Sequence, residues 1–136
     1  MAITMTSDIN PDKLQFQNMR KIKILLIAIL SMIALTSCEK AFDVNSIHFS
    51  IEGGTKTITS SSYTLSIHDR NANYGSSHVD NDIIYAEMDW LKAELDTKTG
   101  LITITAEKNN TGKKRTLYIS GMYADIQSSI PVIQEK

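Results

Sequence analysis

The sequence predicts an all-β protein, a small β-sandwich of about seven strands that follows a signal-peptide helix. Apolar and polar residues alternate with period two in short segments from Ile47 onward, as they do in half-buried strands. Turn-forming clusters such as Gly53-Gly54 and residues 108–113 separate these segments, and many short strands between frequent turns are typical of a sandwich. After Cys38, only residues 83–95 approach a helical period, so a short helix there is the alternative.

Residues 19–37 have the parts of a secretory signal peptide. Basic residues within 20–23 precede about twelve apolar residues over 24–35, a length that suits a signal sequence and falls short of the roughly 20 residues that span a bilayer. The run ends in Leu35-Thr36-Ser37-Cys38, which resembles the lipobox of bacterial lipoproteins, cleaved before the cysteine and diacylated on its thiol. The alternative is a buried helix with an ordinary free cysteine.

Cys38 is the only cysteine of the chain, so lipid on it leaves none for a disulfide. One acyl chain gives only reversible membrane binding, whereas two or more give stable attachment. We therefore expect covalent lipid on Cys38, no other cofactor, and a tether over residues 38–46. We expect residues 1–18 to be a gene-model extension, because Asp8 and Asp12 disrupt a basic leader and Met19 opens a complete signal.

Residues 47–136 are long enough for one small domain. Residues 38–136 contain 10 of the chain's 14 basic residues and 13 of its 15 acidic residues, a net charge of about −3. Nucleic-acid binding needs a basic stripe or patch. The one basic cluster, at 113–115, follows Asn-Asn-Thr-Gly and reads as a solvated turn. The charge balance therefore argues against a nucleic-acid partner.

Each expected strand is bounded by turn residues and shows either alternation or a β-branched run. The expected strands are residues 47–51, 56–60, 63–68, 83–88, 90–95, 101–106, 115–120 and 126–134. Residues 69–82 form a long polar segment that we expect to be a loop, and long loops are commonly functional or mobile. The last strand contains Pro131, which predicts an edge strand because proline cannot donate to a neighbouring strand.

A series of motifs resembles the BACON domain. The motifs, in order, are Gly53-Gly54-Thr55-Lys56, Asp89-Trp90-Leu91, the run 101–106, the segment 109–115 and an apolar strand ending at Gln134. This family is an immunoglobulin-like sandwich common on surface proteins of gut Bacteroidetes and proposed to bind carbohydrate. The resemblance covers roughly residues 45–136 and implies that fold and that function. Two features depart from the family: the polar segment 69–82 is long, and no enzyme or further module follows.

Two aromatic residues are candidates for stacking on a sugar ring. Trp90 opens a strand, and a core position is the stronger interpretation, because sandwiches commonly bury one tryptophan. Tyr74 lies among polar loop residues that could serve a shallow glycan site. The expected contact residues are Asp69, Asn71, Asn73, Tyr74 and His78. The alternative for Tyr74 is a ring folded back onto the sheet, and the remaining strand tyrosines, Tyr85, Tyr118 and Tyr123, are expected to pack along their strands.

Side chains whose oxygen atoms could bind a metal ion also recur in the polar segment 69–82. Asp69, Asn71 and Asn73 stand at alternate positions, as in a calcium-binding EF-hand loop. However, Tyr74 occupies the place of the required glycine, and Asp80 that of the required glutamate. A looser calcium site is a minor alternative, with ligands Asp69, Asn71, Asp80 and Asp82. A polar solvated loop without metal is the preferred interpretation.

Catalytic motifs are not evident. The three histidines lie on separate segments without a metal-ligand spacing,, and there is no Gly-x-Ser-x-Gly elbow. Asp89 and Glu94 are carboxylates, but a glycosidase needs a specific separation that sequence does not give. We therefore expect a non-catalytic outer-membrane lipoprotein, facing either the cell surface or the periplasm, whose module binds carbohydrate. The alternative is a structural or accessory envelope subunit that binds another protein through a strand edge.

Overall fold

The computed structural model describes residues 15, 18–19, 21 and 40–136 of the 136-residue chain. The expected signal peptide over 19–37 and the lipid site at Cys38 therefore lie almost entirely outside the described residues, as does most of the expected extension over 1–18. The strands are β1 Ile47–Phe49, β2 Gly54–Thr59, β3 Ser66–His68, β4 Ser76–Asp80, β5 Ile83–Met88, β6 Leu91–Asp96, β7 Leu101–Ala106, β8 Arg115–Tyr123 and β9 Ile126–Gln134.

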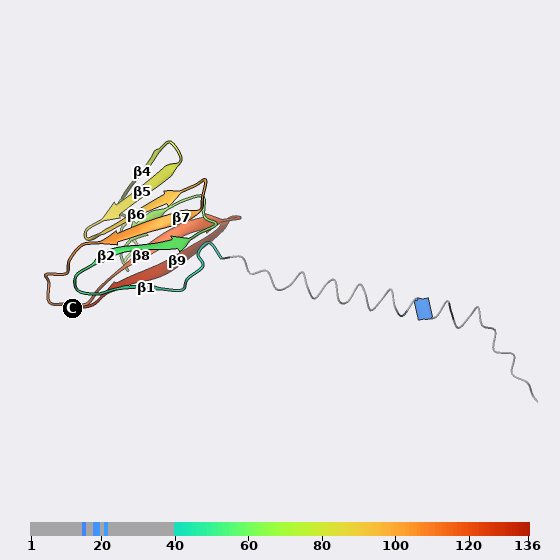
Figure 1. Cartoon of the computed structure of the whole chain (residues 1–136), viewed down its shortest axis with the longest axis horizontal. Coiled ribbons are helices and arrows are strands. Elements are labelled where there is room, and N and C mark those ends of the chain that lie inside the picture. The colour runs from blue at the N-terminus through green and yellow to red at the C-terminus, as the bar shows by residue number, and fades with distance from the viewer. Residues whose placement is uncertain (1–14, 16–17, 20, 22–39) are drawn as a thin grey trace, which may run out of the picture. The chain divides into compact units, whose positions relative to one another are not determined.

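The strands form two sheets packed face to face, so the predicted all-β sandwich is confirmed (Figure 1). One sheet has four strands in the order β1-β9-β8-β3, and the other has five in the order β2-β7-β6-β5-β4. All neighbours are antiparallel except β1 and β9, which are parallel. The described residues contain nine strands rather than about seven: eight of them fall on the ranges expected from sequence, and the ninth, β4, lies in the expected loop.

The core forms between the two sheets because alternate residues of each strand face inward. In β6, Leu91, Ala93 and Leu95 are buried and the residues between them are exposed or half-buried. Ile102 and Ile104 of β7 are fully buried beside them. Every member of the buried hydrophobic cluster lies between Ala41 and Val132. Residues 39–136 thus form a compact unit with its own core, which is what a domain needs to fold independently.

The short helix considered for residues 83–95 is wrong. This segment is the antiparallel hairpin of β5 and β6, joined by the two-residue turn Asp89-Trp90. Asp89 adopts a φ of 48°, a conformation that aspartate tolerates better than most residues. The expected core position of Trp90 is confirmed, since the side chain is only 7% exposed.

The long loop expected over 69–82 is also wrong in part, because residues 76–80 form β4. The sequence of β4 shows no clear alternation of apolar and polar residues, because β4 is an edge strand whose residues are all exposed. At its start the chain passes from one sheet to the other: Tyr74 pairs with His68 of β3, whereas Ser76 pairs with Glu87 of β5. Gly75 occupies the crossing, where a Cβ atom would lie 2.1 Å from the carbonyl oxygen of Glu87.

Pro131 does not mark an edge strand, since β9 lies between β1 and β8. The pairing of β9 with β1 begins at Val132, the residue after Pro131. The proline therefore precedes the ladder to which its missing N–H would have contributed.

Part of the expected tether packs on the sandwich. Ala41 and Phe42 are buried, and Phe42 forms a β-bridge with Ser60. The carbonyl oxygen of Ala41 accepts hydrogen bonds from the hydroxyl of Ser60 at 2.6 Å and from the amide of Ser61 at 3.1 Å. The domain therefore begins at about residue 41 rather than at residue 47.

Candidate functional site

The outer face of the five-stranded sheet is built from the strand residues that alternate with the core. Inward residues such as Ala86 and Ala93 are buried, so their neighbours point away from the core. On β4, β5 and β6 the outward residues include aromatic and charged side chains, and on β2 and β7 they are mainly threonines. The face is consequently polar, with one aromatic region near its β4 edge.

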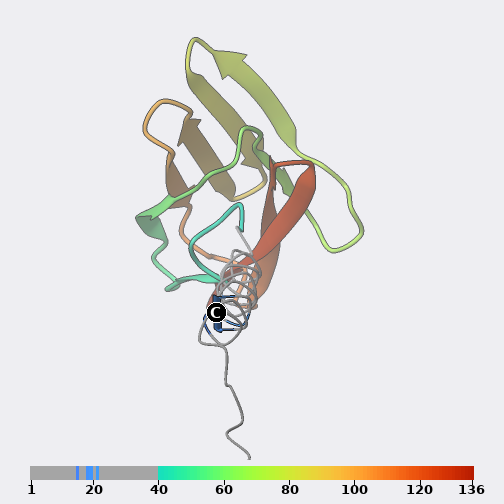
Figure 2. The same ribbon diagram turned by 90° about the vertical axis from the view of Figure 1, so that its right-hand side faces the viewer.

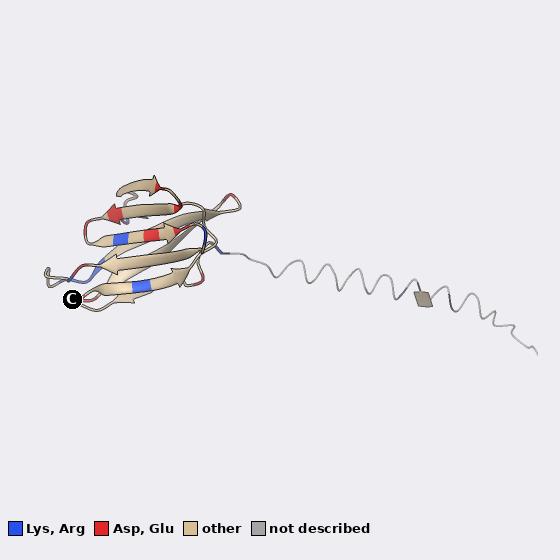
Figure 3. Cartoon of the chain, turned by 45° about the horizontal axis from the view of Figure 1, so that its top comes forward, with Lys and Arg blue, Asp and Glu red and all other residues tan. Residues whose placement is uncertain are grey.

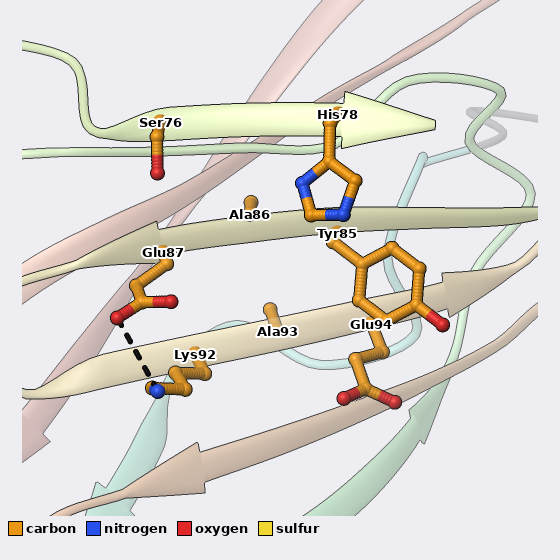
Figure 4. Close-up of a pocket in the computed structure, with 8 residues that line it drawn as sticks. All are labelled: Ser76, His78, Tyr85, Ala86, Glu87, Lys92, Ala93 and Glu94. Carbon is orange, nitrogen blue, oxygen red and sulfur yellow. Dashed lines mark ion pairs between the residues drawn. The ribbon is translucent and has the colours of Figure 1, made fainter. Parts of the chain in front are cut away.

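The imidazole of His78 stacks on the phenol ring of Tyr85 in this region. The two residues are direct cross-strand partners, with ring centroids 4.8 Å apart and planes inclined by 10° (Figure 4). The two-residue turn Asn81-Asp82 aligns them, because the pairing of Asp80 with Ile83 fixes the register of the hairpin. Cross-strand aromatic pairs of this kind stabilise a sheet, and here His78 is exposed and Tyr85 is half-buried.

A carboxylate lies next to the aromatic pair. Glu94 of β6 is the cross-strand partner of Tyr85 and projects from the same face (Figure 4). Within the part of the chain that the structure describes, Glu94 has no hydrogen bond or ion pair. Its two oxygens are therefore free to accept hydrogen bonds from a ligand.

A shallow hollow of about 250 Å³ extends from the aromatic pair to the adjacent row of side chains. Ser76 and His78 of β4 line it, with residues 85–87 of β5 and 92–94 of β6. In the adjacent row, Lys92 forms an ion pair with Glu87 at 3.3 Å (Figure 4). The hollow thus offers an aromatic wall, a hydroxyl, a free carboxylate and a neutralised ion pair. Such a combination of apolar contact with a few polar groups is typical of ligand sites.

The face carries more negative than positive charge. Its outward strand positions include four carboxylates and one ammonium group: Asp80, Glu87, Glu94, Asp96 and Lys92. All of them belong to β4, β5 and β6, the upper strands in Figure 3. The local field therefore disfavours anionic ligands.

The predicted loop residues Asp69, Asn71 and Asn73 form a closed turn. One Asp69 carboxylate oxygen accepts bonds from the amides of Asn71 at 2.8 Å and Asn73 at 2.9 Å, and the other accepts from the Asn73 side chain at 2.8 Å. These hydrogen bonds lower the pKa of Asp69 below its ordinary value of 3.8, and the bond from the Asn73 side chain has the largest effect. Asp69 and Asn73 thus engage each other and offer little to a ligand.

Tyr74 lies apart from His78. Its ring is 57% exposed and rests 5.2 Å from the ring of His68, which in turn stacks on Tyr118 at 5.4 Å. These residues lie on the outer face of the four-stranded sheet, because Ile67 and Ile119 beside them face the core. His78 is on the outer face of the five-stranded sheet. The structure therefore divides the site predicted from sequence between two sheets.

The four residues of the calcium alternative do not converge. Asp69 and Asn71 precede β4, while Asp80 and Asp82 lie at its far end (Figure 2), which places about 13 Å of extended chain between the two pairs. Asp82 instead forms an ion pair with Lys98. Among the described residues no group of three histidine, cysteine, aspartate or glutamate side chains is placed to hold a metal ion.

Tyr85 and Glu94 are the residues that sequence analysis did not assign to a site. The sequence predicts that Tyr85 packs along its strand and offers Glu94 only as a catalytic carboxylate. The signal was available in the alternation of residues 83–88: Ile84, Ala86 and Met88 pack on the core, so Tyr85 must face outward. A hairpin turn at Asn81-Asp82 would then have placed His78 opposite Tyr85.

No helix that could cross a membrane occurs in the part of the chain that the structure describes. Cys38 lies outside that part, so its lipidation stays a prediction from sequence.

Comparison with known proteins identifies no family and gives two partial similarities to solved structures. No family model and no curated protein matches the chain. A Bacteroides thetaiotaomicron protein solved by NMR is similar over 73% of this chain and 80% of its own, with 10% identity and a TM-score of 0.49. A Bacteroides ovatus GH5 xyloglucanase, solved with a XXXG heptasaccharide, is similar over 67% of this chain but only 17% of its own, with 19% identity and a TM-score of 0.41. At these values the likeness does not bear on function.

Proposed function

We propose that this chain is a lipid-anchored protein of the cell envelope whose sandwich binds carbohydrate without catalysis. The anchor is inferred from the signal-like residues 19–37 and from Cys38 after the lipobox. Attachment through Cys38 would place the domain at a membrane surface, and we assign it to the outer membrane with the binding face exposed. The resemblance of residues 45–136 to the BACON domain supports the binding role.

The observation that carries the proposal is the His78–Tyr85 stack beside the free carboxylate of Glu94. Sugar rings present C–H groups on their faces and hydroxyls at their edges. A flat aromatic surface matches the first, and a carboxylate that can accept two hydrogen bonds matches the second. We therefore place the binding site on the sheet face rather than at Tyr74, whose neighbours Asp69 and Asn73 are hydrogen-bonded to each other.

A glycan-array screen of residues 39–136 tests this proposal. We expect binding that falls at least tenfold in Tyr85→Ala and in Glu94→Gln, because each removes a main contact. Tyr63→Ala is the control, since Tyr63 is an exposed tyrosine (51%) that lies outside the sheet face. Equal loss in Tyr63→Ala, or loss in Tyr74→Ala alone, would contradict the placement of the site. Absence of binding to any glycan by folded protein would contradict the function.

A second function is favoured by the β4 edge. β4 ends the five-stranded sheet and contains neither lysine nor proline, the residues that commonly protect an edge. Val79 is 67% exposed there. An envelope protein could therefore add a strand to β4, as in the accessory-subunit alternative. Cross-linking in cells from a photoreactive residue at position 79 would capture such a partner, and a probe at Thr116 on the other sheet is the control.

A further inference from the structure

Five outward residues form a continuous row across the five-stranded sheet. His78 pairs with Tyr85, and Tyr85 with Glu94. Glu94 pairs with Thr103, and Thr103 with Thr57. We call these five residues the cross-sheet row. Because neighbouring strands are about 4.8 Å apart, the row is about 19 Å long and perpendicular to the strands.

The whole cross-sheet row is accessible. His78, Glu94 and Thr57 are exposed, while Tyr85 and Thr103 are half-buried. Its chemistry changes along its length, from the aromatic pair through a carboxylate to two hydroxyl groups. A ligand that contacted only the hollow at His78 and Tyr85 would leave Thr103 and Thr57 unused. A ligand that followed the row would meet a hydrogen-bonding group on each of its last three strands.

The charge on the outer face of the five-stranded sheet restricts the class of ligand that can bind there. The only ammonium group among the outward strand positions, Lys92, is already paired with Glu87, and three further carboxylates lie on the same face at Asp80, Glu94 and Asp96. A polysaccharide of uronic acids or sulfated sugars would be repelled there. A neutral chain of sugars would not.

We infer that the cross-sheet row binds a linear, neutral oligosaccharide that crosses the strands and occupies about four sugar units. In an extended chain each pyranose unit advances the chain by a distance close to the spacing of about 4.8 Å between neighbouring strands, so successive units meet successive strands. The aromatic pair stacks on the first units, Glu94 accepts hydrogen bonds from the next, and Thr103 and Thr57 bind the last. This inference depends on the proposed carbohydrate-binding function and adds to it the shape, length and charge of the ligand.

Calorimetric titration of residues 39–136 tests the inference with cello-, xylo-, manno- and malto-oligosaccharides from two to six units, and with oligogalacturonates as the anionic series. We expect one of the neutral series to bind, with an affinity that rises at least tenfold from the disaccharide to the tetrasaccharide and then levels off. The oligogalacturonates should bind at least tenfold more weakly.

Variants along the row separate the inference from the proposed function. Thr57→Val and Thr103→Val retain the branched shape of threonine, so we expect them to fold, to weaken the tetrasaccharide several-fold and to leave the disaccharide unchanged. Tyr85→Ala should weaken both, and Thr116→Val on the other sheet should weaken neither. Binding that does not depend on length or on the threonines, or a preference for the anionic series, would overturn the inference and leave carbohydrate binding intact. If neither neutral nor anionic series binds, both the inference and the proposed function fail.

Discussion

The guanidinium of Arg115 lies over the indole of Trp90, 4.6 Å from the ring centroid, and thereby joins the turn between β5 and β6 to the first residue of β8 in the opposite sheet. The same guanidinium donates to the side-chain oxygen of Gln134 at 2.9 Å and to the carbonyl oxygens of Glu107 and Lys108. Gln134 is fully buried and donates in turn to the carbonyl oxygens of Ser50 and Glu107. This network closes one end of the sandwich without a disulfide.

Replacement of Arg115 should therefore destabilise the domain more than the loss of one surface charge. We expect Arg115→Met to lower the free energy of unfolding by about 2–3 kcal/mol, because it removes the cation–π contact and leaves the buried acceptor of Gln134 unpaired. Arg115→Lys should recover less than half, since lysine lacks the planar fork of donors. Urea denaturation of residues 39–136 measures this loss. Arg70→Met, in an exposed turn, is the control, and equal losses in the two variants would refute the role of the network.

The crossing of the chain between sheets at Gly75 should not tolerate a side chain. A Cβ atom there would lie 2.1 Å from the carbonyl oxygen of Glu87 and 2.6 Å from the Cβ of Met88. We expect Gly75→Ala to cost about 2–4 kcal/mol, as overpacking in a close backbone approach does. Gly112→Ala is the matched control, because its φ is +68° with open space around it, and about 1 kcal/mol of backbone strain is expected. A thermal unfolding series that ranks Gly112→Ala as the more harmful change would contradict this geometry.

The Asp69 turn should be sensitive to acid. Its hydrogen bonds lower the pKa of Asp69 below 3.8 in the folded protein, so the carboxylate stabilises the turn fully above about pH 3.8, and this contribution is lost as the pH falls through the lowered pKa. We expect the amide resonances of Asn71 and Asn73 to titrate below pH 3.8 in NMR spectra. In Asp69→Asn this titration should vanish.

Asp96 supplies an internal control for that experiment. The amides of Lys98 and Thr99, which donate to Asp96, lower its pKa in the same way. Their titration should persist unchanged in Asp69→Asn. If the Asn71 and Asn73 amides still titrate in that variant, the carboxylate of Asp69 does not control the turn.

Lipid attachment at Cys38 predicts a clear labelling result. Cells that express the full chain with radioactive palmitate should incorporate label, because two or more acyl chains are attached to a lipobox cysteine, and the protein should sediment with membranes. Cys38→Ser should carry no label and should lose stable membrane attachment. Label that persists in Cys38→Ser would place the lipid elsewhere, and an unlabelled wild type would remove the anchor from the proposed function.

Local patterns account for most of the strands. Alternation identified β1 and β6 because one face of each is buried and the other is not, and turn residues at 96–100 and 108–113 separated the segments correctly. β4 was missed because, at the edge of its sheet, all five residues are exposed, so burial leaves no pattern in its sequence. The edge strand predicted from Pro131 was wrong for a related reason. Whether a strand lies at an edge depends on its neighbours in the sheet, which for β9 include the parallel strand β1.

The sequence alone determined the fold class and the buried position of Trp90, because each follows from the chemistry of residues close together in the chain, and it predicts the anchor at Cys38. Only the tertiary structure decided which residues share a surface. It separated Tyr74 from His78 at Gly75, and it brought His78, Tyr85, Glu94, Thr103 and Thr57 into one row from five strands. Strand order and register set these neighbours, and both arise from the packing of the whole core rather than from any one segment.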